Sequence, residues 1–237
     1  MNNYRKTASL VGVLYIIGTV AGILSVAASA PLREAAYLSS IAVNPNQIVV
    51  AALFILLMGL ALALVPILLF PLLKKYNEVL ALGYVVFRGA LETALYIGMT
   101  ISWLTLIALS LESAKAGAAA AAGYQALGTI LLAGHEMMTT ILIIIFSLGA
   151  LMLYTAFYRS QLIPRWLSVW GFIAILLHLS TAMLIVFRFA TPTSEIIVAV
   201  NLPIFLQEMV MAVWLIAKGF NSTAIAAKVA MNSGDRK

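Results

Sequence analysis

The chain has 237 residues, of which 64% are hydrophobic and 9% are charged. A soluble globular domain carries about 25% charged residues, so this composition excludes a soluble domain and predicts one membrane domain. There is no cysteine, which excludes disulfides, thiolate catalysis, iron–sulfur clusters and cysteine-based zinc sites. The net charge of +6 comes from basic residues at the ends of apolar runs, where membrane topology explains them better than nucleic-acid binding does.

The first apolar run, at about 7–30, follows a short polar start that contains Arg5 and Lys6. The run exceeds the roughly 7 to 15 apolar residues of a signal peptide, and it is long enough to cross a bilayer. The alternative is a cleaved leader, because the small residues that end the run resemble a cleavage site, but the next residue is proline. We therefore expect a retained first helix, followed by an outer loop over 31–47.

Five more runs are long and apolar enough to span a membrane. They lie at about 48–73, 79–111, 124–157, 166–189 and 196–220. Pro66 and Pro71 predict a kink in the second helix. The fourth run is longer than a bilayer requires, which implies tilt or a projecting end. Residues 112–123 are expected to form an alanine-rich connection, and residues 221–237 a flexible cytoplasmic tail. The predicted fold is a single all-α membrane domain over 1–220, a polytopic bundle of six transmembrane helices.

The basic residues favour one orientation. With the N-terminus inside, the inner side collects ten of them: Arg5, Lys6, Lys74, Lys75, Arg159, Arg165, Lys218, Lys228, Arg236 and Lys237. The outer side has three: Arg33, Lys115 and Arg188. The positive-inside rule therefore predicts that both termini face the cytoplasm, in a multi-pass protein of the inner (cytoplasmic) membrane.

Several polar side chains fall inside the predicted helices, where each charge costs roughly 2.5 to 3.5 kcal/mol on insertion scales and marks a functional site. The candidate binding residues are Arg88, Glu92, Glu208, His178, Gln207, Tyr84, Glu136 and His135. At 1.5 Å per residue, the first four lie about 13 to 19 Å from the inner ends of their helices and share one layer. His135 and Glu136 lie nearer the outer end. The four-residue spacing of Tyr84, Arg88, Glu92 and Tyr96 predicts one helix face.

Two interpretations of this layer stay open. Either Arg88 and its carboxylates form a structural clamp between helices, or the layer titrates. One arginine faces the carboxylates of Glu92 and Glu208, and that of Glu136 as well if this residue reaches the layer. The carboxylates therefore outnumber the arginine, and we expect at least one of them to be protonated, to share a proton with a histidine or to be balanced by a bound cation. Proton-coupled transport needs such a cluster. Because an arginine that precedes a glutamate is the poorer orientation within a helix, we expect Glu208 to be the chief partner of Arg88.

Enzyme signatures are mostly missing from the sequence. His135-Glu136 begins like the zinc motif H-E-x-x-H, but residue 139 is threonine. The estimated depths of His135 and His178 differ by about 16 Å, too far for a shared haem. We therefore expect no metal and no cofactor, and the catalytic residues stay unknown.

Three classes of function remain open. They are a small-molecule or proton-coupled transporter or ligand-binding protein, an intramembrane enzyme that uses histidine and glutamate, and a structural or accessory membrane subunit. The expected partners are the lipid bilayer and a small-molecule or lipid ligand, without nucleic acid, and the oligomeric state stays open.

Four segments are distinctive: RKTASLVGVLYIIGTVAGIL, KKYNEVLALGYVVFRGALE, LYTAFYRSQLIPRWLSVWGF and LPIFLQEMVMAVWLIAKGFN. Through them the chain, from about residue 5 to 221, resembles the bacterial membrane-protein family catalogued as domain of unknown function 4386. The resemblance implies an integral membrane protein of about six helices. It implies no activity, ligand or catalytic residue.

Overall fold

The computed structural model describes residues 2–117, 120–192 and 194–234, and within these ranges the regular structure is entirely helical. Six helical spans are long and apolar enough to cross a bilayer. They are Asn3–Ala28, Pro45–Leu73, Glu78–Ala116, Ala121–Ser160, Arg165–Val186 and Glu195–Ala217. The predicted all-α bundle of six transmembrane helices is therefore confirmed, and the chain is a multi-pass membrane protein.

Five of these spans are single helices. They are α1 (Asn2–Ala28), α3 (Pro45–Leu73), α6 (Ala121–Ser160), α7 (Arg165–Val186) and α8 (Glu195–Ala217). The third span is composite and runs through α4 (Glu78–Tyr84), the π-helical segment η2 (Val85–Leu91) and α5 (Glu92–Ala116). The span begins at Asn77, whose side chain accepts a hydrogen bond from the backbone N–H of Leu80 at 2.9 Å. It ends at Gly117, whose φ of 74° favours glycine and stops the helix.

The loop expected over 31–47 contains helical structure. A 3₁₀ turn, η1 (Ala30–Arg33), is followed by the short helix α2 (Tyr37–Val43). Helix α2 buries Tyr37 and Ile41 against α3 and α5, so it forms because it covers an apolar surface. A loop prediction from polar and turn residues alone misses this contribution from packing.

The tail expected over 221–237 is also helical where it is described, as α9 (Ser222–Gly234). The side chain of Asn221 starts α9 by accepting the backbone N–H of Thr223 at 3.1 Å. Residues 235–237 of that tail, 118–119 of the predicted connection and 193 of the last loop lie outside the described residues.

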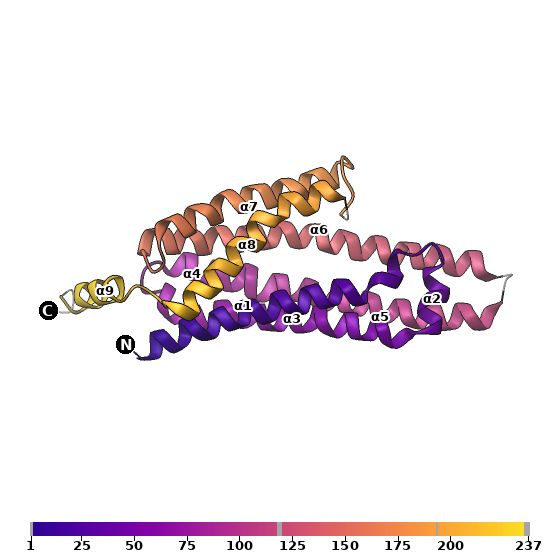
Figure 1. Cartoon of the computed structure of the whole chain (residues 1–237), viewed down its shortest axis with the longest axis horizontal. Coiled ribbons are helices and arrows are strands. Elements are labelled where there is room, and N and C mark those ends of the chain that lie inside the picture. Colours follow the sequence, from indigo (N-terminus) through magenta and orange to yellow (C-terminus); the bar gives the residue numbers. More distant parts are fainter. Residues whose placement is uncertain (1, 118–119, 193, 235–237) are drawn as a thin grey trace.

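The start of α1 and helix α9 lie at one end of the bundle, together with the α3–α4 and α6–α7 turns (Figure 1). We call this the proximal end. Hydrogen bonds tie it together: Arg5 of α1 donates to the carbonyls of Ile216 and Ala217 at the end of α8, at 2.7 and 3.0 Å. The first and last transmembrane helices are therefore joined at their proximal ends.

At the opposite, distal end, α5 and α6 run past the ends of α7 and α8 (Figure 1). The last turn of α7 packs on α6 near Ile143, through Ile185, so the part of α6 before about residue 140 has no α7 beside it. Since α6 has 40 residues and α7 has 22, their lengths are about 60 and 33 Å. We call residues 99–116 of α5 and 121–139 of α6 the distal hairpin.

Candidate functional site

Arg88 lies in the π-helical segment η2, between α4 and α5. The backbone N–H of Glu92 bonds to the carbonyl of Phe87, five residues back, instead of four. Such π-turns are rare and frequently occur at functional sites. The π-turn lies within the four-residue face that the sequence predicts from Tyr84 to Tyr96, and the four side chains of that face are all buried.

A small residue on a neighbouring helix makes room for this wider segment. A Cβ on Gly149 of α6 would lie 3.2 Å from the backbone nitrogen of Arg88. A Cβ on Gly89, within the segment, would lie 3.4 Å from the ring of Pro66 in α3, an ordinary contact distance. The close approach to the π-segment therefore comes from Gly149, a residue remote in the sequence.

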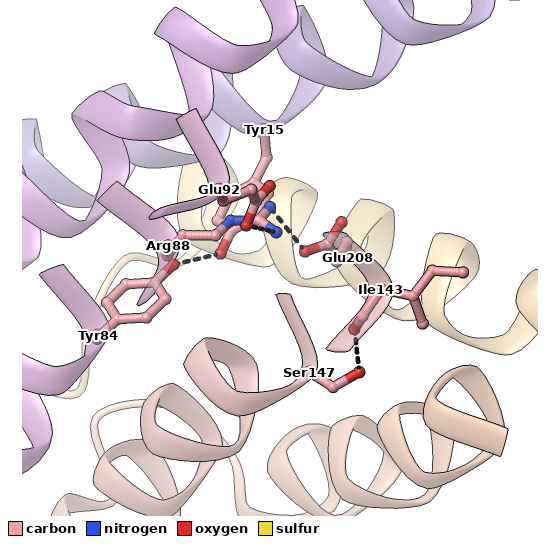
Figure 2. A network of polar contacts seen from close by, with 7 residues as sticks. All are labelled: Tyr15, Tyr84, Arg88, Glu92, Ile143, Ser147 and Glu208. Carbon is pink, nitrogen blue, oxygen red and sulfur yellow. Dashed lines mark hydrogen bonds and ion pairs between the residues drawn. The ribbon is translucent and has the colours of Figure 1, made fainter. Parts of the chain in front are cut away.

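The guanidinium of Arg88 donates to two carboxylates from two helices (Figure 2). Its Nη1 lies 3.1 Å from Oε2 of Glu92 in α5, and its Nη2 lies 3.3 Å from Oε1 of Glu208 in α8. Arg88 and Glu92 are 2% and 1% exposed, whereas Glu208 is 17% exposed. The structure brings these three predicted residues together. Both carboxylates lie within ion-pair distance of Arg88, and the ranking of Glu208 as its chief partner stays a prediction.

Two aromatic rings enclose the same guanidinium. The ring of Phe146 in α6 lies 4.4 Å from the Arg88 Cζ atom and that of Tyr15 in α1 lies 5.9 Å away, within the range of cation–π attraction. The hydroxyls of Tyr15 and Tyr84 are 3.1 Å apart in a buried contact (Figure 2). Sequence reasoning included Tyr84 but missed Tyr15 and Phe146, because an aromatic residue in an apolar helix carries no distinguishing signal.

The pairing of this cluster is incomplete. Among the described residues, Nε of Arg88 and Oε1 of Glu92 have no hydrogen-bond partner. The Tyr96 hydroxyl interacts with the Glu92 carboxylate, but this contact does not form a hydrogen bond to Oε1. An unsatisfied buried polar atom costs about 1 to 3 kcal/mol, so a proton, water or small ligand would be stabilised here. We call Tyr15, Tyr84, Arg88, Glu92, Phe146 and Glu208 the Arg88 cluster.

Gln207 faces a different set of partners from its neighbour Glu208. Its Oε1 accepts the Tyr154 hydroxyl at 2.5 Å, and its Nε2 donates to the carbonyl of Leu167 at 3.1 Å. These bonds join α6, α7 and α8 through a side chain that is 0% exposed. Both ends of the amide are satisfied, so this predicted residue acts as a link between helices.

His178 lies beside the Arg88 cluster. Its Nδ1 is 2.7 Å from Oδ1 of Asn201, which joins α7 to α8. Its ring meets the edge of Phe146 with centroids 5.1 Å apart. Phe146 therefore contacts both Arg88 and His178, and it separates the imidazole from the guanidinium.

His135 and Glu136 lie elsewhere, in the distal hairpin. The ring of His135 stacks on Trp103 at 4.5 Å, and Glu136 is exposed. Ten residues of α6 separate Glu136 from Phe146, about 15 Å of helix, so the structure does not bring this glutamate to Arg88. Over the described ranges, no group of three histidine, cysteine or acidic residues is placed to hold a metal ion.

Comparison with known proteins identifies a family but no characterised relative. Residues 10–219 match the family described as Domain of unknown function (DUF4386). The matched region runs from α1 to just beyond α8 and includes every member of the Arg88 cluster. No curated protein and no solved structure matches the chain.

Proposed function

The chain belongs to this family of unknown function, and we propose that it is a proton-coupled membrane transporter whose proton-binding element is the Arg88 cluster. One observation carries the proposal: a single buried guanidinium is shared by two carboxylates from different helices. With both carboxylates ionised the group carries one excess negative charge, which a low-dielectric interior disfavours. A proton or a small cationic substrate would remove that excess.

The two carboxylates differ in a way that assigns them different roles. Glu92 is 1% exposed and belongs to the same span as Arg88, whereas Glu208 is 17% exposed and comes from α8. Protonation of Glu208 would weaken its attraction to Arg88 and leave Arg88 and Glu92 as a neutral pair. We therefore assign the exchangeable proton to Glu208 and the permanent counter-charge to Glu92.

Helix α8 has a feature that suits movement. Pro203 lies inside it, five residues before Glu208, and a proline removes one backbone hydrogen bond and favours a bend. The bond between His178 and Asn201 ties this part of α8 to α7. Loss of the Glu208 ion pair would thus loosen the part of α8 before Pro203 and the α7 segment bonded to it, while Gln207 keeps the rest of α8 tied to α6 and α7. The proton would be coupled to the position of that part of α8.

For orientation, we propose that both termini face the cytoplasm and that the protein lies in the inner membrane. The ten-to-three distribution of basic residues supports this by the positive-inside rule. The position of the start of α1 and of α9 at one end of the bundle supports a shared side (Figure 1). Reporter fusions at Lys115 and after Lys237, a residue outside the described ranges, are expected to report opposite sides of the membrane. Agreement between the two reporters would refute the six-helix topology.

The test of the proton site is direct. Infrared difference spectra of purified protein, recorded during a pH titration, should contain the carboxylic-acid signal of a titrating buried glutamate. Glu208→Gln should remove that signal, and Glu136→Gln is the matched control because its carboxylate is exposed. Proteoliposomes that contain a pH-sensitive dye should take up protons with the wild type and with Glu136→Gln, but not with Glu208→Gln. Identical titrations of wild type and Glu208→Gln would refute the proposal.

A structural or accessory subunit is the second candidate. The fully satisfied bonds of Gln207 favour it, because they join three helices without leaving a reactive group. If this role were the whole function, Glu208→Gln would change stability alone and leave proton uptake at the level of the wild type.

A further inference from the structure

A second polar site lies at the proximal end, outside the Arg88 cluster. A cavity of about 410 Å³ opens between the α6–α7 turn and the α8–α9 turn. Residues 161–165, Trp214 and residues 218–222 line it. Its volume falls within the roughly 300 to 1,000 Å³ of small-molecule pockets.

The charges of this cavity are of one sign. Arg165 and Lys218 belong to the lining, and none of the described lining residues is acidic. Neither side chain takes part in an ion pair among the described residues, and the Arg165 guanidinium lies over the Tyr158 ring, 5.3 Å from its centroid. Both cations are thus available to an anion, and an arginine is well suited to phosphate oxygens.

The backbone around the cavity is held in place without a ligand. The backbone N–H of Asn221 donates to the carbonyl of Leu162 at 2.9 Å, and the Asn221 side chain donates to the carbonyl of Gln161 at 3.2 Å. Gly219, with φ of 75°, turns the chain where a Cβ would lie 2.8 Å from Nη1 of Arg5. The two turns are therefore tied together, and a third cation lies close to the second turn.

Tryptophan side chains place the cavity at the surface of the bilayer. Trp214 lines it and meets Trp166 edge to face at 6.5 Å, and Trp166 stacks on Trp170 at 6.3 Å. Tryptophan is enriched at the level of the lipid headgroups. Helices α7 and α8 both run from the cavity into the membrane and expose apolar side chains such as Val169 and Val213, where acyl chains would pack.

We infer that this cavity binds the phosphate headgroup of an anionic phospholipid, with Arg165 and Lys218 as the phosphate ligands and Trp214 as the wall beside the glycerol. Basic pockets between transmembrane helices on the cytoplasmic side bind such headgroups in other proteins. The inference is independent of the Arg88 cluster, because the two sites share no residue. A soluble phosphate compound has the same binding chemistry, and the experiment below separates the two sources.

Lipid retention tests whether this cavity binds an anionic phospholipid. Protein exchanged into equal amounts of phosphatidylglycerol and phosphatidylcholine is washed with detergent, and the lipids that remain bound are counted by native mass spectrometry. We expect the wild type to retain phosphatidylglycerol in preference, and the double variant Arg165→Gln/Lys218→Gln to lose that preference by about tenfold or more, because two charge-assisted contacts are removed. The control, Arg159→Gln/Lys74→Gln, makes the same change of charge at the same end with exposed residues outside the cavity and should behave as the wild type.

Two further measurements complete the test. In the wild type alone, phosphatidylglycerol should raise the melting temperature more than phosphatidylcholine does, a result that needs no variant to fold. Equal retention by the wild type and the cavity variant, or equal stabilisation by the two lipids, would overturn the inference. Displacement of the bound lipid by millimolar glycerol 3-phosphate would overturn the assignment to a membrane lipid and indicate a soluble phosphate ligand.

Discussion

The proximal half of the bundle, which contains the Arg88 cluster, joins helices partly through charged side chains, and the distal half, which contains the distal hairpin and α2, joins them through hydroxyl groups. Around the Arg88 cluster, helices meet through charged side chains: α5 and α8 both contact one guanidinium. In the distal half, hydroxyl groups donate to backbone carbonyls. Ser102 of α5 bonds to Leu131 of α6 at 3.2 Å, and Ser110 of α5 bonds to Leu38 of α2.

This difference shows which contacts the packing of the helices needs and which contacts go beyond it. The distal half shows that neutral hydroxyls and apolar contacts are enough to hold helices of this chain together, as is usual in membrane bundles. An arginine with two glutamates costs far more to bury. The proximal half therefore contains charge that helix packing does not require, which supports a role for the Arg88 cluster beyond structure.

The largest expected effect comes from Arg88→Met. The change leaves Glu92 and Glu208 buried without their cation, and breaking a buried ion pair on one side costs about 3 to 5 kcal/mol. Thermal unfolding in detergent should show this loss. The double variant Arg88→Met/Glu208→Gln should recover part of it, whereas strict additivity of the two single losses would mean that Arg88 and Glu208 do not interact.

A smaller loss is expected for Glu208→Gln. The guanidinium keeps Glu92 as a partner, so the cost is that of one hydrogen bond to a charged group, about 1.5 to 3 kcal/mol. Unfolding of this variant should be compared with that of Glu136→Gln, which removes an exposed carboxylate and should change stability little. Equal losses of stability in Glu208→Gln and Glu136→Gln would mean that the proximal half does not depend on its buried charge.

The smallest effect is expected for Ser110→Ala in the distal half. It removes the bond to the Leu38 carbonyl, and a hydrogen bond of this kind between membrane helices contributes about 0.6 kcal/mol. Stability should fall by about that amount, and proton uptake by proteoliposomes should stay at the wild-type level. A loss of uptake would show that the distal half also takes part in transport.

The sequence alone predicts the membrane spans and the layer of buried charge. Helical rise is fixed, so counting residues from the inner ends placed Arg88, Glu92 and Glu208 at one depth. The positions around each helix were harder to predict, because they depend on packing with other helices. The π-turn at Arg88 packs closely against Gly149 of another helix, and no local pattern reports such a contact.

The distance along the chain between Arg88 and Glu208 has a consequence for how the protein is made. They lie 120 residues apart, so at about 5 to 20 residues per second the ribosome needs roughly 6 to 24 s to supply the second carboxylate after the arginine. During that interval Glu92, four residues from Arg88, is the counter-charge that the same span provides. We expect Glu92→Gln to lower membrane insertion of nascent chains that end before α8, whereas Glu208→Gln, tested in the full chain, should leave insertion at the wild-type level.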